Sequence, residues 1–197
     1  QGTFLDANES PYGTINRYPD PYQSDLKKEL AAFKLVQTDE IFIGNGSDEA
    51  IDLLFRVFCE PGVDKVISFT PGYGMYQVSA SIQDIEHINL SLNKDFQIDK
   101  KSVSTYLTDD SVKLLFLCSP NNPTGNLIES ADIQWLLDEF KGILVIDEAY
   151  IDFANSESWT MKLGDHDRLV ILQTMSKAWG LAGARVGMAY ANSSIIS

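Results

Sequence analysis

Residues 143–150 read Ile-Leu-Val-Ile-Asp-Glu-Ala-Tyr, and this stretch decides the fold class. Four consecutive apolar residues predict a strand buried on both faces, as the strands of a parallel sheet are. Asp147 ends the run, and a carboxylate there is costly to bury unless a positive group partners it. Tyr150 follows three residues later, close enough to serve the same ligand. The stretch therefore predicts a buried strand with chemistry at its carboxyl end, although Asp147 as a simple turn cap is the plainer alternative.

Apolar runs of the same kind recur along the chain and alternate with helical patterns. Ser24 and Ser47 are candidate helix caps. Strands that alternate with helices predict an α/β protein with a largely parallel sheet flanked by helices. Such sheets bind ligands at the carboxyl ends of their strands, where the polar residues discussed below lie. Expected strands cover 41–43, 66–69, 86–90, 113–118, 169–174 and 185–191, and expected helices cover 24–33, 47–59, 73–81 and 131–140.

The charge balance excludes several classes of partner. Lys and Arg total 15 and Asp and Glu total 28, which gives a formal charge of -13. Nucleic-acid binding and docking on anionic membranes both need clustered basic residues, so neither is expected. An anionic ligand must be held by local groups against an unfavourable overall field. The 197 residues, 44% of them apolar, suit one domain or one large domain with part of a second.

The cysteines and the chain ends indicate where the protein works. Cys59 and Cys118 both lie in apolar runs, which predicts buried free thiols in a reducing cytoplasm. No apolar stretch is long enough to span a bilayer, and the N-terminus lacks the pattern of a signal peptide. The chain starts at Gln1 and stops at Ser197, soon after a strand-like run. These two features suggest a fragment of a longer protein.

A glycine-bearing turn, Gly44-Asn-Gly-Ser-Asp48, leads into an expected helix. The free N–H groups and positive dipole end of such a helix can bind a phosphate. A plain capped helix is the simpler alternative, with Asp48 and Glu49 favouring the dipole. If a phosphate binds, both carboxylates must point away from it. Tyr73, at the start of the next expected helix, offers either a stacking surface for a planar cofactor or ordinary packing.

The segment Ser119-Pro-Asn-Asn-Pro-Thr-Gly125 follows a buried strand and cannot be regular structure. Asn122 would be presented rigidly between its neighbours Asn121 and Pro123. The alternative is an ordinary loop in which the asparagines satisfy local backbone groups.

Lys177 follows an apolar strand in the run Thr174-Met-Ser-Lys, which carries little charge. Such surroundings favour the amine form, and an amine can form a Schiff base with an aldehyde. Arg185 lies eight residues further on and can grip a phosphate with two hydrogen bonds. A solvent-facing lysine and a surface ion pair are the alternatives for these two residues.

The combination of these motifs carries more weight than any one of them. A phosphate cradle, a stacking ring, an acid for a pyridinium nitrogen, a hydroxyl for a phenolate oxygen and a lysine amine suit one cofactor. That cofactor is pyridoxal 5'-phosphate, for which the acid and the lysine are the expected protein contacts.

On these motifs the chain resembles the fold-type I, class II pyridoxal-phosphate-dependent aminotransferases. The motifs are Ser-Pro-Asn-Asn-Pro-Thr-Gly, Asp-Glu-Ala-Tyr, Ser-Lys-Ala and Gly-Ala-Arg-Val-Gly. Asn-Arg-Tyr-Pro-Asp-Pro, Gly-Asn-Gly-Ser-Asp-Glu and Tyr-Gly-Met-Tyr resemble the histidinol-phosphate aminotransferase subgroup. The resemblance implies a three-layer α/β/α large domain over 24–197, preceded by an N-terminal arm over 1–23. It also implies a C-terminal small domain that this chain lacks.

The resemblance also implies a role for each motif residue. Lys177 would hold the cofactor aldehyde and move a proton between the substrate Cα and the cofactor, while Asp147 would keep the ring nitrogen protonated. Tyr18 would reach the cofactor phosphate of a partner subunit, which implies a homodimer. The other implied contacts are Tyr150 and Asn122 at the phenolic oxygen, Tyr73 on the ring, Gly46, Ser47, Asp48, Ser176 and Arg185 at the phosphate, and Asn8, Glu9 and Asn122 at the substrate.

The activity implied by the resemblance is reversible amino transfer in histidine biosynthesis. L-Histidinol phosphate and 2-oxoglutarate would exchange with imidazole-acetol phosphate and L-glutamate. An aromatic or broad-specificity aminotransferase, or a threonine-phosphate decarboxylase, would use nearly the same residues. A non-catalytic pyridoxal-phosphate-binding or regulatory module is the alternative from another class. Trp179 and Ala184 depart from the usual family residues, a phenylalanine and a larger apolar residue.

Overall fold

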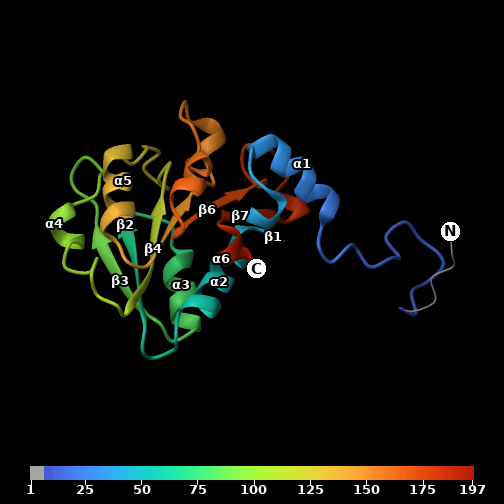
Figure 1. The fold of residues 1–197 in the computed structure, drawn as a ribbon, viewed down its shortest axis with the longest axis horizontal. Helices are drawn as coiled ribbons and strands as arrows, with labels where there is room; N and C mark the ends of the chain where they lie inside the picture. The colour runs from blue at the N-terminus through green and yellow to red at the C-terminus, as the bar shows by residue number, and fades with distance from the viewer. Residues whose placement is uncertain (1–6) are drawn as a thin grey trace.

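The computed structural model describes residues 7–197, which form one seven-stranded sheet with helices on both faces (Figure 1). The order across the sheet is β1-β7-β6-β5-β4-β2-β3. The five adjacent strands β3, β2, β4, β5 and β6 are parallel to one another, while β7 is antiparallel to both β6 and β1. The strands are β1 (Ile41–Asn45), β2 (Lys65–Thr70), β3 (Glu86–Ser91), β4 (Val112–Cys118), β5 (Ile143–Asp147), β6 (Leu169–Thr174) and β7 (Val186–Ala191).

The helices form two layers because successive residues of each buried strand face opposite sides of the sheet. In β5, Leu144 and Ile146 belong to one buried cluster, and Ile143 and Val145 belong to the other. The first cluster includes residues of α1, α4 and α5, and the second includes residues of α2 and α3. The helices are α1 (Ser24–Lys34), α2 (Ser47–Phe58), α3 (Met75–Ile82), α4 (Lys100–Val103), α5 (Ser130–Glu139) and α6 (Ser193–Ile196). Short 3-10 turns are η1 (Thr38–Glu40), η2 (Ile151–Phe153), η3 (Trp159–Asp165) and η4 (Ala182–Ala184).

The architecture confirms the predicted α/β class and its mostly parallel sheet. Every expected strand is present, and the strand expected over 169–174 has the bounds of β6. Cys59 and Cys118 are buried and free, as expected. No helix within 7–197 is long and apolar enough to cross a membrane.

The predicted helix caps are wrong by one residue. Ser24 and Ser47 are the first helical residues of α1 and α2, and neither is the cap. The cap positions belong to Gln23, with φ 48°, and Gly46, with φ 86°. A positive φ is easily adopted by glycine, so Gly46 turns the chain from β1 into α2 without strain. Tyr73 precedes α3 by two residues and lies in the turn before it.

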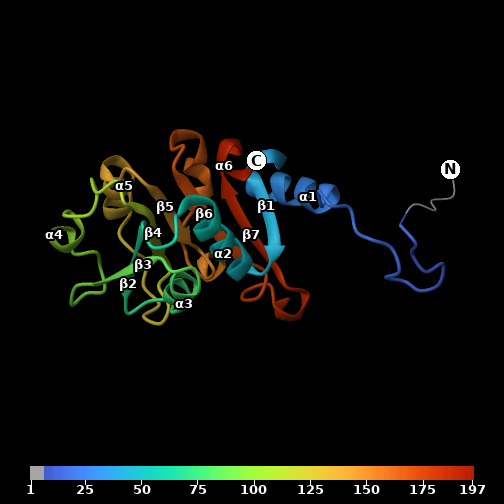
Figure 2. The ribbon, with the colours of Figure 1, turned by 90° about the horizontal axis from the view of Figure 1, so that it is seen from below.

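Residues 7–23 form an arm that extends away from the sheet and its helices (Figures 1 and 2). Residues 1–6 of the expected arm lie outside the described residues. Large side chains of the arm are uncovered, with Tyr12 84% exposed and Ile15 96% exposed. Residues 24–197 contain the whole sheet, and the arm adds nothing to it.

Candidate active site

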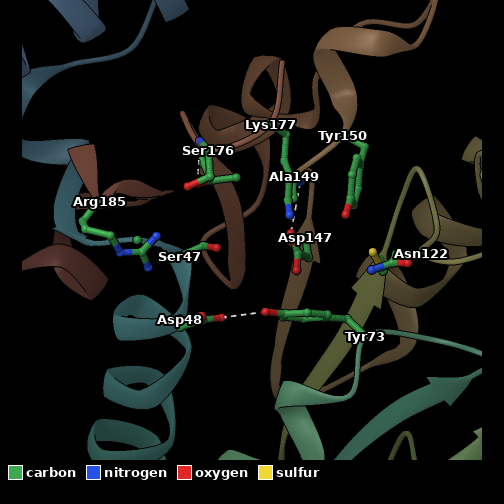
Figure 3. Close-up of a pocket in the computed structure, with 13 residues that line it drawn as sticks. Ser47, Asp48, Tyr73, Asn122, Asp147, Ala149, Tyr150, Ser176, Lys177 and Arg185 are labelled. Carbon is green, nitrogen blue, oxygen red and sulfur yellow. Dashed lines mark hydrogen bonds between the residues drawn. The ribbon is translucent and has the colours of Figure 1, made fainter. Parts of the chain in front are cut away.

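A cavity of about 150 Å³ lies at the carboxyl edge of the parallel strands (Figure 3). Segments that follow β4, β5 and β6 meet there because parallel strands end at the same edge. The N-terminus of α2 and the turn before α3 complete its walls. The lining residues are Gly46, Ser47, Asp48, Tyr73, Cys118, Asn122, Asp147, Ala149, Tyr150, Thr174, Ser176, Lys177 and Arg185.

The structure brings together most of the residues singled out from the sequence. Ten of them line this one cavity although they span positions 46–185. They are Gly46, Ser47, Asp48, Tyr73, Asn122, Asp147, Tyr150, Ser176, Lys177 and Arg185. Convergence of polar groups from distant segments in one concavity is the usual form of a ligand site.

Lys177 lies in the turn after β6, three residues beyond the end of the strand. Its side chain is directed into the cavity toward Asp147 (Figure 3). The Nζ atom lies 5.6 Å from the centroid of the Tyr150 ring. Gly180 N donates to the Lys177 carbonyl at 3.0 Å and so tightens the turn that carries the lysine. The amine is therefore presented from a short, hydrogen-bonded turn.

Asp147 ends β5 and is only 2% exposed. Its Oδ2 accepts a hydrogen bond from the Tyr76 hydroxyl at 2.7 Å, and its Oδ1 accepts one from Ala149 N at 3.1 Å. Burial raises the pKa of this carboxyl above its ordinary value, while the two hydrogen bonds lower it. No cation within residues 7–197 forms an ion pair with it. The buried acid therefore faces the cavity without an ion pair among these residues, and the charge of Lys177 acts on it only from a greater distance.

Glu148 is the neighbour of Asp147 but faces the opposite side of the sheet. It accepts hydrogen bonds from Ser158 Oγ at 2.5 Å, Trp159 N at 2.8 Å and Gln173 Nε2 at 2.8 Å. These contacts join β5 to β6 and to the start of η3. Glu148 is thus a structural residue, and it fixes the backbone at the end of β5.

The N-terminus of α2 comes very close to β7 at the edge of the cavity. A Cβ atom on Gly187 would collide with the backbone of Gly46 and Ser47, and a Cβ on Gly46 would collide with the Arg185 guanidinium. Arg185 Nη2 donates to Asn45 O at 3.3 Å. Because Gly46 and Gly187 have no side chains, the Arg185 guanidinium can lie next to the free N–H groups at the start of α2. These donors together form a suitable site for an anion.

Both carboxylates at this helix end are engaged by other groups. Asp48 Oδ1 accepts a hydrogen bond from the Tyr73 hydroxyl at 2.9 Å (Figure 3). Glu49 Oε2 accepts from Asn45 N at 2.5 Å. Burial, followed by the bond to Asp48, raises the pKa of the Tyr73 hydroxyl, which keeps it protonated as a donor. The backbone N–H groups of the first turn are thereby left to an external anion.

The two asparagines after β4 have different tasks. Asn121 is buried, and its Nδ2 donates to Pro71 O at 3.0 Å and to Thr124 Oγ1 at 2.7 Å. Asn122 lines the cavity, opposite the arginine corner and near Tyr150 (Figure 3). The loop is thus held by one asparagine while the next faces the ligand space.

Several lining residues were not identified from the sequence. Cys118, Ala149 and Thr174 border the cavity because they end β4, follow β5 and end β6. Tyr76 lies beneath it and bonds to Asp147. Its partner lies 71 positions away in the sequence, so no local spacing pointed to this contact. Burial raises the pKa of the Cys118 thiol to about 12, so the thiol stays protonated.

Three residues predicted at the site lie outside the cavity in the single chain. Asn8, Glu9 and Tyr18 belong to the extended arm. Glu9 pairs with Arg17 Nη1 at 2.6 Å and accepts from the backbone N–H of Tyr18 at 2.6 Å. The Tyr18 side chain is 77% exposed. The arm is thus folded on itself locally, and its predicted contacts to substrate and to a partner subunit stay predictions.

The residues that line the cavity match the chemical groups of pyridoxal phosphate, the cofactor that the motifs suggested. The buried carboxyl of Asp147 matches a protonated ring nitrogen. The glycine-lined corner with Arg185 matches a phosphate, and the Lys177 amine matches an aldehyde. Tyr73 and Asn122 supply a ring face and a polar group between these points. The residues present therefore fit pyridoxal phosphate.

Comparison with known proteins gives one consistent picture. The family described as aminotransferase class I and II matches residues 5–197. The chain is 48% identical over 202 residues to the histidinol-phosphate aminotransferase of Cytophaga hutchinsonii, covering all of this chain and 58% of that protein. It is 51% identical to the enzyme of the same name from Bacteroides fragilis, covering 98% of this chain and 56% of that protein.

A solved structure with the same fold contains the expected ligand. The histidinol-phosphate aminotransferase from Sinorhizobium meliloti, in complex with pyridoxal-5'-phosphate, matches with a TM-score of 0.83 and 26% identity. The match covers 91% of this chain and 50% of that chain. The chain thus spans about half the length of the relatives it matches.

Proposed function

Because the chain belongs to the aminotransferase class I and II family, we propose that it is the cofactor-binding part of a histidinol-phosphate aminotransferase. The protein would bind pyridoxal phosphate and transfer an amino group reversibly between L-histidinol phosphate and 2-oxoglutarate. One observation carries the proposal: the Lys177 amine and the buried Asp147 carboxylate open into the same cavity. The names of the relatives that match almost the whole chain support the choice of substrate.

Pyridoxal phosphate, when bound, supplies a cationic ring that withdraws electrons from the substrate Cα. Lys177 Nζ would hold the aldehyde end and then carry the proton away from Cα. Asp147 would hold the proton at the ring nitrogen, since its carboxylate is buried and forms no ion pair within residues 7–197. Tyr150 and Asn122 would donate hydrogen bonds to the phenolic oxygen.

The opposite end of the cavity suits the phosphate. The backbone N–H groups of Ser47 and Asp48, the Ser176 hydroxyl and the Arg185 guanidinium would bind it. Tyr73 would lie against the ring face, and its bond to Asp48 fixes its orientation. Three anchors at separate points orient a flat ligand completely, so the reacting carbon would sit next to Lys177.

The arm belongs to the same proposal. Residues 1–23 would contribute Asn8 and Glu9 to the substrate site, and 24–197 would form the cofactor-binding domain. Tyr18 would reach the cofactor phosphate of a second copy, so the working unit would be a homodimer. The homodimer would act in the cytoplasm, where histidine biosynthesis would take place. The uncovered aromatic side chains of the arm support this arrangement, because an exposed apolar surface is stabilised when a partner covers it.

Covalent trapping tests the lysine assignment. The chain is mixed with pyridoxal phosphate, reduced with borohydride, digested and analysed by mass spectrometry. The cofactor mass should appear on the peptide containing Lys177, and Lys177→Ala should remove it. Lys162→Ala is the matched control because that lysine is exposed and pairs with Asp165, away from the cavity. Label spread evenly over surface lysines would refute the assignment.

Substrate choice is tested in a full-length protein that contains this chain. Half-reactions are followed with L-histidinol phosphate, phenylalanine and threonine phosphate as separate donors. The first donor should react with the highest kcat/KM. A preference for phenylalanine would point to an aromatic aminotransferase, and release of carbon dioxide from threonine phosphate to a decarboxylase.

A further inference from the structure

We propose that Tyr76 is a positioning residue for Asp147: its buried hydroxyl fixes the carboxylate so that the acid can hold the ring nitrogen of the cofactor. The inference rests on the proposed function and adds to it a residue that does not itself line the cavity. Tyr76 lies in α3, 71 positions from Asp147 in the sequence, and its hydroxyl donates to Asp147 Oδ2 at 2.7 Å.

The tyrosine ring is held from several sides. Tyr76 is 1% exposed and stacks on Phe116, with ring centroids 4.7 Å apart and an interplanar angle of 18°. Tyr73 packs edge-on against it at 5.6 Å. Phe116 stacks in turn on Phe55 at 5.3 Å. A ring held in this way has little rotational freedom, so the hydroxyl oxygen stays in place beside Asp147.

The direction of the hydrogen bond is fixed by the chemistry of the two groups. Burial, and then the charge of Asp147, raises the pKa of the Tyr76 hydroxyl, so tyrosine keeps its proton and donates it. An ionised carboxylate only accepts. Ala149 N holds the other carboxylate oxygen at 3.1 Å. The carboxylate is therefore gripped at both oxygens, and its plane cannot turn without breaking a bond.

Opposing groups around Asp147 explain why this bond matters. Burial and the charge of Asp48 favour the protonated acid, whereas Tyr76, Ala149 N and the charge of Lys177 favour the carboxylate. The Cys118 thiol also faces this corner, and it contacts Tyr76. Among these groups Tyr76 is the buried side-chain donor that bonds directly to the acid. Loss of its hydroxyl shifts the balance toward a neutral acid, which cannot partner a ring cation.

The first test compares two ligands on the full chain. Tyr76→Phe keeps the stacked ring and removes the hydroxyl alone. Affinity for pyridoxal phosphate should fall by about tenfold or more, the usual effect of losing a hydrogen bond to a charged group. Affinity for 1-deazapyridoxal phosphate, which lacks the ring nitrogen, should stay within about twofold, because a hydroxyl that acts through the nitrogen contact has no effect there. Equal losses for both ligands, or no loss for either, would overturn the inference.

Tyr190→Phe is the matched control. Tyr190 is fully buried, and its hydroxyl has no hydrogen-bond partner within the described residues. It belongs to the cluster on the other side of the sheet from Tyr76. Its phenylalanine variant should leave the affinities for both ligands unchanged, which separates the effect at Asp147 from the general effect of removing a buried hydroxyl.

The second test needs no cofactor. The Asp147 carboxyl carbon is followed by ¹³C NMR across pH in the ligand-free chain. Tyr76→Phe should raise the pH midpoint of the Asp147 titration, and Tyr190→Phe should not.

If the Tyr76→Phe chain fails to fold, 3-fluorotyrosine at position 76 keeps the shape of the ring and makes the hydroxyl a stronger donor. The pH midpoint of the Asp147 titration should then fall. An unchanged midpoint with either replacement refutes the role of Tyr76. Absence of trapping on Lys177 in the unmodified chain would instead refute the proposed function, so the two failures are distinct.

Discussion

In the proposed function, Asp147 serves binding at the expense of stability. Its carboxyl is buried, its pKa is raised by that burial, and no cation of the described chain pairs with it. A group placed in this way destabilises the empty protein and gains its partner only with the ligand. If the proposed function holds, the same residue links folding, pH and cofactor binding.

Asp147→Asn should stabilise the ligand-free chain at neutral pH. Because the folded-state pKa lies above the ordinary 3.8, the folded chain binds this proton more tightly than the unfolded chain does. The contribution of Asp147 to stability is therefore best below pH 3.8 and declines as pH rises through the folded-state pKa. Asparagine cannot ionise, so we expect a gain of about 1–3 kcal/mol at pH 7.

Urea unfolding at several pH values measures this gain. Asp110→Asn is the control, because that side chain is 87% exposed and its replacement should change stability by less than about 0.5 kcal/mol. Pyridoxal phosphate should bind the Asp147→Asn chain more weakly. A less stable variant at neutral pH would contradict the assigned cost of the buried charge.

At the scale of elements, the site depends on how closely α2 approaches β7. Gly187 lies in β7 directly against the backbone of Gly46 and Ser47 at the start of α2. No side chain fits between these elements. The corner that would hold the phosphate therefore depends on a strand and a helix end in direct backbone contact.

Gly187→Ala should separate this strand from the helix end. The added methyl group meets backbone atoms, which cannot rotate away, so we expect a loss of about 1–3 kcal/mol in unfolding free energy. Affinity for pyridoxal phosphate should fall more than affinity for pyridoxal, which lacks the phosphate. Gly164→Ala is the control, since a Cβ there meets nothing within 4 Å. Retained stability and retained phosphate discrimination in Gly187→Ala would be inconsistent with the close contact.

The side chain of Trp179 connects the turn after β6 to η2. Trp179 Nε1 donates to Asp152 Oδ2 at 2.9 Å, and Lys34 Nζ lies 3.8 Å from the other oxygen of Asp152. The Trp179 ring also packs edge-on against Phe33 of α1 at 5.5 Å. The lysine-bearing turn is therefore connected to the segment after Tyr150 and to α1.

Trp179→Phe should loosen that turn without unfolding the chain. Phenylalanine keeps an aromatic contact but cannot donate to Asp152. Because the side chain is 44% exposed, the global change should stay below about 1 kcal/mol. Hydrogen exchange of the amides over 175–183 should become several-fold faster, while exchange in β6 stays unchanged. Unaltered exchange over 175–183 would show that the bond to Asp152 does not restrain the turn.

The sequence predicted the strands and the residues that line the cavity better than it predicted the turns and the supporting contacts. Strand β6 is a continuous apolar run, and such runs locate strands and the polar residues that follow them, as with Lys177. By contrast, η3 begins where Ser158 bonds to the buried Glu148, a contact between segments that local pattern does not encode. The role of Tyr76 was missed for the same reason, since its partner is 71 residues away.

At the scale of the whole molecule, the negative charge of the chain opposes the binding of an anion in the cavity. The formal charge is -13, and the proposed cofactor is an anion. The donors near Arg185 attract the cofactor only over hydrogen-bond distances, whereas the acidic residues repel it over long distances, and salt screens this repulsion. The rate of association should therefore depend on salt more strongly than the contacts within the cavity do.

Raising the ionic strength should speed the association of pyridoxal phosphate. The Debye length shrinks from about 30 Å at 0.01 M to about 8 Å at 0.15 M, so long-range repulsion is largely removed. We expect the association rate constant, measured by stopped flow, to rise by about twofold or more over this range. Pyridoxal without its phosphate is the control and should change little. A slower association in salt would show that attraction by the basic corner governs the approach.

The opposed orientations of Asp147 and Glu148 have a consequence for how this chain tolerates change. Asp147 and Glu148 are adjacent in the chain, yet Asp147 faces the cavity and Glu148 holds the start of η3 against the sheet. Deleting or inserting a single residue in β5 would move each side chain to the other face of the sheet, so Glu148 would lose its contacts with η3 and Asp147 would leave the cavity. We therefore expect a change in the length of β5 to impair both the packing of η3 and the cavity at once.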